Sequence, residues 1–147
     1  MKRVWSSEPT NELERLIVEL HNSGSVVFVF GVGWWTAHLL GTTTPMFHGE
    51  PADRRWHVEV GDQQTKWIMD VNLNEISSVQ FVRERSPFPA FAGEESVTVR
   101  FVGPDPDDPH SIIYCFIDVY DEQRRLRPDK LDAWTRWRDQ YGGSVPA

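Results

Sequence analysis

The chain has 147 residues, the size of one ordinary domain, so we expect a single domain over residues 1–147. Its net charge of −7 argues against a nucleic-acid partner, because proteins that bind nucleic acids usually present a net basic surface. The single cysteine excludes an internal disulfide, and no apolar run approaches the roughly 18 residues of a membrane span. With no secretory leader visible at the N-terminus, we expect a cytoplasmic protein without a membrane partner.

The first periodic segment covers residues 10–22 and predicts an amphipathic helix. Its apolar residues Leu13, Leu16, Ile17 and Leu20 recur at the spacing of one helical face. After it the apolar period changes from about 3.6 to two, which indicates strands. The candidate strands are 26–31, 34–40, 55–61, 66–71, 75–84, 95–103 and 111–119, and we expect roughly eight in total.

The segments between these strands are too short for crossover helices, so the sheet is expected to be mainly antiparallel. A second helix follows Pro128, a residue well suited to a first helical turn, and carries Trp134 and Trp137 toward one side. The sequence therefore predicts an α+β fold. A large, mainly antiparallel sheet of about eight strands carries an N-terminal and a C-terminal helix packed on it.

The segment 29–41 combines the closely spaced Gly31 and Gly33 with two adjacent tryptophans and a histidine in an apolar run. It lacks the third glycine of a dinucleotide-binding turn, so we interpret it as a hairpin. Strand alternation then places Trp34 and His38 on one face. His38 could ligate haem iron or touch a flat ligand, and it could equally be a core histidine bonded to a backbone carbonyl.

Two other histidines lie near a possible pocket. His48 falls in a segment predicted to be a loop that could fold over such a pocket. His57 alternates with Arg55 and Glu59, which predicts a face toward solvent or a pocket rim. The cysteine, Cys115, lies in an apolar strand and is expected to be a small buried hydrophobic residue.

The connection after residue 83 places basic groups beside aromatic rings. Arg83, Arg85, Phe88 and Phe91 suit an anionic, flat ligand, because a guanidinium pairs with a carboxylate while a ring covers the ligand face. The alternative is a long hairpin whose phenylalanines pack down onto the protein. No arrangement for nucleophilic catalysis can be assembled from the spacing of the candidate residues.

Two quoted segments resemble the bacterial cytosolic haem-utilisation family, the haem carriers and hemin-degrading proteins of the HemS, ChuX and HutX type. They are EISSVQFVRERSPFPAFAGEESVTVRF at 75–101 and CFIDVYDEQRRLRPDKLDAW at 115–134. The resemblance covers about residues 70–138, and residues 26–41 fit it more loosely. It implies a large antiparallel sheet with helices at its ends, haem held by histidine, and a homodimer of single-repeat chains.

The chain departs from the family at the two positions that the resemblance assigns to haem histidines. These positions are Gly31 and Asp70. The resemblance is therefore to a divergent member of the family, in which His38 or His48 would have to supply the iron ligand. The resemblance implies a non-catalytic binding or carrier protein for haem or a related planar anionic small molecule. The predicted ligand-binding residues are Trp34, His38, Trp56, Arg83 and Arg85.

Two alternatives stay open at the level of sequence. The chain could be an interaction or structural module that keeps the fold without a ligand, using its tryptophans for contacts with partners. It could also be a haem-degrading enzyme. That reading requires an axial histidine and an electron donor, and the missing family histidines argue against it.

Overall fold

The computed structural model describes most of the chain. The described residues are 5–23, 26–32, 35–40, 44–61, 64, 66–85, 95–108 and 111–142.

Two helices, α1 (Glu12–Asn22) and α2 (Pro128–Tyr141), stand near the two ends of the chain, as predicted. Between them the described residues form strands and two short 3₁₀ turns, η1 (Pro51–Asp53) and η2 (Leu73–Glu75). The strands are β1 (Val26–Val32), β2 (Trp35–Leu40), β3 (Met46–His48), β4 (Arg55–Gly61), β5 (Lys66–Asn72), β6 (Ser78–Arg85), β7 (Glu95–Val102) and β8 (Ile112–Ile117).

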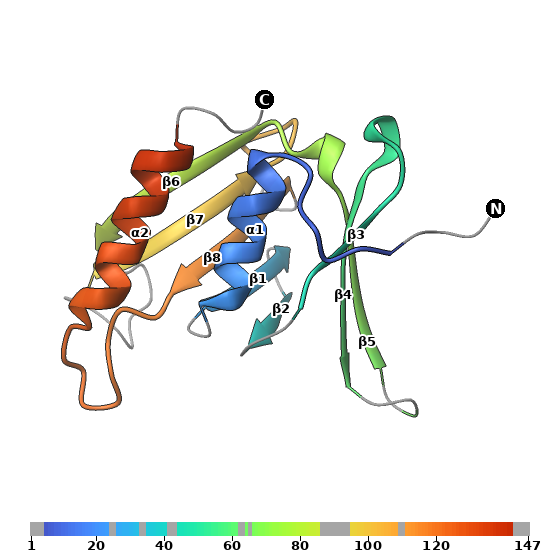
Figure 1. Ribbon diagram of the computed structural model, residues 1–147. Helices are drawn as coiled ribbons and strands as arrows, with labels where there is room; N and C mark the ends of the chain where they lie inside the picture. Colours follow the sequence, from blue (N-terminus) through green and yellow to red (C-terminus); the bar gives the residue numbers. More distant parts are fainter. Residues whose placement is uncertain are drawn as a thin grey trace.

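The strands form two sheets, and this corrects the expectation of one large sheet. A five-stranded sheet has the order β2-β1-β8-β7-β6, and a three-stranded sheet has the order β3-β4-β5. Every strand pair in the described part of the chain is antiparallel, which confirms that part of the prediction. The chain leaves the large sheet after β2, builds the small sheet locally, and returns to the large sheet at β6 (Figure 1).

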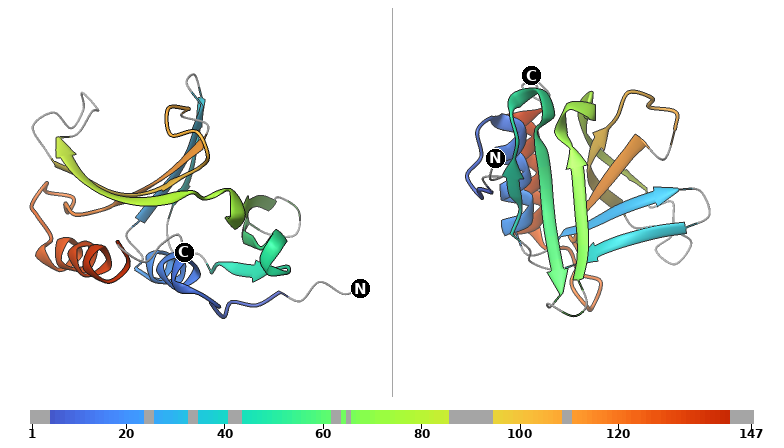
Figure 2. Two further views of the ribbon diagram at one scale, coloured as in Figure 1. Left: turned by 90° about the horizontal axis from the view of Figure 1, so that it is seen from above. Right: turned by 90° about the vertical axis from the view of Figure 1, so that its right-hand side faces the viewer.

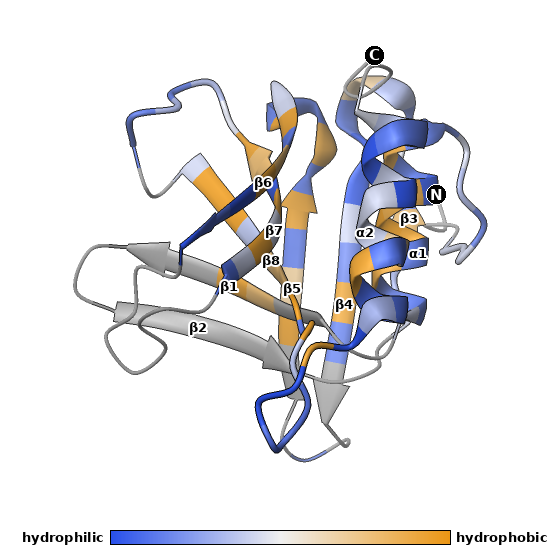
Figure 3. Ribbon diagram, turned by 90° about the vertical axis from the view of Figure 1, so that its left-hand side faces the viewer, coloured by the Kyte–Doolittle hydropathy of each residue, from blue (hydrophilic) through white to orange (hydrophobic). Residues whose placement is uncertain are grey.

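Both helices pack on the same face of the five-stranded sheet (Figures 1 and 2). The helix α1 begins after Asn11, whose side chain accepts a hydrogen bond from the backbone N–H of Glu14 and so caps the first turn. The helix α2 is fixed by Trp134, whose indole N–H donates to the Thr98 carbonyl at 3.1 Å. Figure 3 shows hydrophilic and apolar residues interspersed along both helices, as expected where each packs through one side.

The small sheet joins the rest of the molecule through its inner face. Phe47, Trp56 and Val58 lie there and are fully or almost fully buried. The Trp56 ring meets the rings of Phe28 on β1 and Phe101 on β7 at centroid distances of 5.5 and 5.6 Å. The core therefore continues from the large sheet into the small one, and strand alternation turns the neighbouring side chains of β4 outward.

Candidate functional site

The five-stranded sheet has a second face that no described helix covers (Figure 2). One cross-strand row runs over this face through all five strands. In the observed register Gln80 pairs with Arg100, Arg100 with Tyr114, Tyr114 with Val29, and Val29 with His38. We call this row and its neighbours the open face. It brings a basic residue, an aromatic residue and a histidine position into one line.

Aromatic and cationic groups meet in the middle of the open face. The rings of Tyr114 and Phe116 stack with centroids 6.1 Å apart and planes 22° apart, and both side chains are half-buried. The Arg100 guanidinium lies 5.2 Å from the centroid of the Tyr114 ring and pairs with the carboxylate of Glu84. The arrangement places two aromatic rings and a guanidinium side by side on one face of the sheet, groups that can contact a planar anion.

Among the described residues, the structure does not bring Trp56 and the two arginines together with the strand position of His38. Trp34 lies outside the described residues. His38 lies in β2 and its backbone register is known, while its side chain falls outside the described part of the chain. Trp56 lies in the core with 0% of its surface exposed, and its indole N–H donates to Nε2 of His21 at 3.2 Å.

The two predicted arginines lie in β6. Arg83 pairs with Val97 and Arg85 with Glu95 in the β6–β7 register. Since side chains alternate along a strand, both belong to the face opposite Gln80 and Arg100. Arg83 is exposed, and its Nε donates to the Glu95 carboxylate at 2.5 Å. The sheet therefore separates these arginines from the row of His38.

The strand β3 corrects the expectation that His48 lies in a loop. His48 pairs with Arg55 in the β3–β4 register, and its side chain is 5% exposed. It belongs to the outer face of the small sheet, the face turned away from the core. A ligand atom of His48 lies within 4.8 Å of ligand atoms of His57 and Asp70. This histidine cluster stands on a different sheet from His38.

No pattern in the sequence identifies the cluster as a unit. His57 was expected at a solvent face or pocket rim. Alternation assigns the face correctly, but the side chain is only 5% exposed. The burial comes from Trp5, whose ring centroid lies 4.1 Å from that of His48 and 4.4 Å from that of His57. The sequence feature that comes closest to predicting the cluster is the β4–β5 hairpin, because its register places His57 opposite Asp70.

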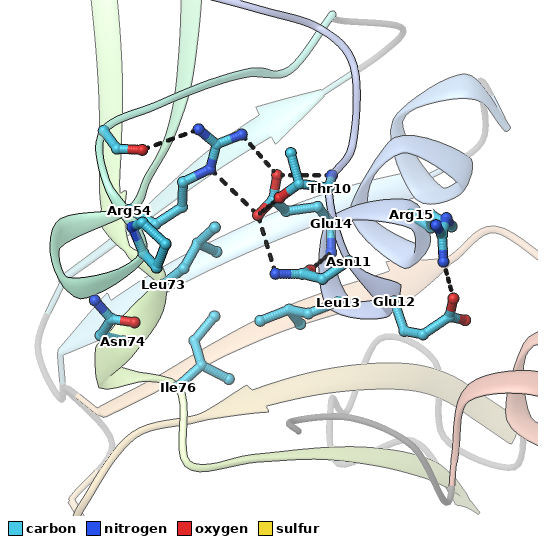
Figure 4. Close-up of a pocket in the computed structure, with 12 residues that line it drawn as sticks. Thr10, Asn11, Glu12, Leu13, Glu14, Arg15, Arg54, Leu73, Asn74 and Ile76 are labelled. Atoms are coloured by element: carbon cyan, nitrogen blue, oxygen red, sulfur yellow. Dashed lines mark hydrogen bonds and ion pairs between the residues drawn. The ribbon is translucent and has the colours of Figure 1, made fainter.

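A cavity of about 730 Å³ lies between the start of α1 and the small sheet (Figure 4). Its polar centre is the carboxylate of Glu14, which is fully buried. This carboxylate accepts hydrogen bonds from Thr10, from the side chain of Asn11, and from Nε and Nη2 of Arg54. Arg54 also donates to the carbonyl of Gly49. These hydrogen bonds satisfy the buried carboxylate, and the ion pair joins α1 to the residue that precedes β4.

No protein-family model matches the chain, and no curated protein matches it in sequence. Solved structures with a similar fold do exist. One is the crystal structure of ChuX, which aligns with a TM-score of 0.62 at 9% sequence identity, over 94% of this chain and 76% of that chain. At this identity the similarity concerns the fold, and it supports the ChuX-like α+β architecture. None of the helices in the described part of the chain is long and apolar enough to cross a membrane.

Proposed function

We propose that the protein binds haem or a related planar anionic ligand without transforming it, and that the ligand lies on the open face. His38 supplies the iron ligand, the rings of Tyr114 and Phe116 cover the macrocycle, and Arg100 pairs with a carboxylate. The proposal concerns binding alone; haem degradation would also need an electron donor.

The cross-strand row carries this proposal. In the observed register one line joins Arg100, Tyr114 and the position of His38. A guanidinium beside an aromatic face can pair with a carboxylate while the ring lies against a flat ligand. The sequence resemblance to haem-utilisation proteins and the ChuX-like fold support the same class of ligand.

Hemin titration followed by absorbance tests the proposal. We expect a Soret band that saturates at one hemin per chain and is lost in His38→Ala. Arg100→Gln should weaken binding by roughly tenfold, the effect of losing one charge-assisted hydrogen bond. Arg83→Gln is the matched control, since Arg83 also sits in a cross-strand ion pair but on the opposite face of the sheet.

A spectrum identical to that of hemin in buffer would contradict the proposal and favour the alternative of an interaction module. Equal affinity of the wild-type protein and His38→Ala would contradict the assignment of the iron ligand. Circular dichroism of each variant separates loss of binding from loss of the fold.

The proposal includes the homodimer that the family resemblance implies. Sedimentation equilibrium should give twice the mass of one chain at micromolar concentration. The mass of a single chain at every concentration would contradict the dimer, and it would leave the hemin titration as an independent test.

A further inference from the structure

The histidine cluster combines side chains from all three strands of the small sheet. His48 comes from β3, His57 from β4 and Asp70 from β5, and one ligand atom of each lies within 4.8 Å of the others. The register explains the meeting: His57 pairs directly with Asp70, and His48 pairs with Arg55, two residues before His57 on the same face. Paired strands of one sheet therefore fix the positions of all three ligand groups.

The N-terminal segment covers the cluster. Ser6 forms an isolated antiparallel bridge with Phe47, with backbone hydrogen bonds of 3.0 and 2.7 Å in the two directions. This bridge adds the segment to the edge of β3 and sets the Trp5 ring against both imidazoles. Both histidines are 5% exposed while Asp70 is exposed, so the cluster is shielded on one side and accessible on the other.

The hydrogen bonding of His57 leaves one ring nitrogen available. Its Nε2 lies 3.0 Å from the Glu59 carboxylate, which can only accept a hydrogen bond when ionised, so Nε2 carries the proton. In the neutral imidazole the other nitrogen, Nδ1, is then an acceptor, and it is buried without a hydrogen-bond partner among the described residues. A buried acceptor without a partner costs stability, and a metal ion would satisfy it. A carboxylate that holds the far nitrogen is the usual support of a metal-binding histidine.

We infer that the histidine cluster binds a divalent first-row transition metal ion, with Zn²⁺ as the reference ion. Imidazole and carboxylate are the ligands that such ions take in proteins. Tetrahedral ligands about 2.0–2.1 Å from zinc are about 3.3 Å apart, so the separations must close by at most about 1.5 Å. Asp70 is exposed and can turn toward the two imidazoles to do so.

Three protein ligands leave a fourth coordination position for water or another small ligand. Asp70 is the exposed member of the set, so the fourth position lies on its side, away from Trp5. The site does not depend on the proposed haem function, because its residues lie on the small sheet and the open face lies on the large one.

Calorimetric titration of the metal-free protein with zinc chloride tests the inference. We expect one Zn²⁺ per chain, with affinity reduced at least tenfold in Asp70→Asn and again in His57→Ala. Asp139→Asn is the matched control, because Asp139 is an exposed carboxylate on α2 that should not affect zinc binding. Asp70→Asn keeps the shape of an exposed side chain, so it tests the site even where the buried His57→Ala variant fails to fold.

A second readout uses Trp5. Co²⁺ bound at the cluster should quench the fluorescence of the wild-type protein more than that of Trp5→Phe, and excess Zn²⁺ should reverse the difference. Absence of stoichiometric zinc binding, or equal affinity in the wild-type protein and Asp70→Asn, would overturn the inference. Hemin affinity should be the same in Asp70→Asn and the wild-type protein. A hemin site lost with His57 or Asp70 in a protein that does not bind zinc would assign the cluster to haem iron instead, and would also overturn it.

Discussion

The sequence predicts that Trp56 contacts a ligand, whereas in the structure Trp56 packs in the hydrophobic core. Its ring contacts the rings of Phe28 on β1 and Phe101 on β7, and its indole N–H donates a hydrogen bond to His21. Trp56→Phe should lower the free energy of unfolding by roughly 2–3 kcal/mol, because it leaves a cavity and removes a buried hydrogen bond. Urea denaturation followed by circular dichroism measures the loss, and hemin affinity should stay unchanged. A loss below about 0.5 kcal/mol would contradict the core assignment.

Cys115 lies in the middle of β8 and is fully buried, as the sequence predicted. Burial raises the pKa of its thiol well above the ordinary value, since an apolar surrounding disfavours the thiolate. A raised pKa means less thiolate at any given pH, so near pH 8 we expect the folded protein to react with Ellman's reagent very slowly. Unfolding should release one reactive thiol per chain. Rapid reaction of the folded protein would contradict this account.

The histidine cluster shows which part of a site local patterns can predict. Alternation along β4 places His57 and Trp56 on opposite faces, and the structure agrees. The partner of His57 depends on the length of the β4–β5 loop, because a shift of one residue would set a different side chain opposite it. The shielding of the histidines by Trp5 depends on a bridge between Ser6 and Phe47, two residues that lie far apart in the sequence. No local sequence pattern predicts that contact.

At the scale of elements, the Arg54–Glu14 ion pair fixes α1 to the small sheet (Figure 4). Arg54→Met should destabilise the protein by about 3 kcal/mol, because it leaves the fully buried Glu14 carboxylate without its counter-charge. Arg15→Met is the matched control. Arg15 forms an exposed pair with Glu12, and its loss should cost less than about 0.5 kcal/mol. Thermal unfolding of both variants distinguishes them, and equal losses would contradict a structural role for the buried pair.

The elements themselves were largely predictable, and their grouping into sheets was not. The apolar spacing of Leu13 to Leu20 and the proline at 128 locate both helices to within two residues. Sheet membership depends instead on contacts such as Phe28 with Cys115, which join strands from opposite ends of the chain. The short strand β3 also lacked a recognisable pattern, because three residues are too few to show alternation.

At the scale of the whole molecule, the two sheets carry two different sets of candidate ligand-binding groups. The large sheet offers an open face with aromatic rings and Arg100, and the small sheet offers imidazoles and a carboxylate on its outer face. The sequence prediction assumes that the ligand-binding residues share one sheet. In the structure Trp56 lies in the core, and Arg83 lies on the face of the large sheet opposite Arg100. The candidate ligand site is therefore the cross-strand row that contains His38.

The most direct test of the proposed function is to map the ligand on the protein by amide NMR during a titration with gallium protoporphyrin, a diamagnetic analogue of hemin. We expect the largest shift changes at Val29, Tyr114 and Phe116 and at their neighbours in β1, β2 and β8. The amides of β3, β4 and β5 should be unaffected. Changes confined to His48 and His57, or no changes at saturating ligand, would contradict binding on the open face.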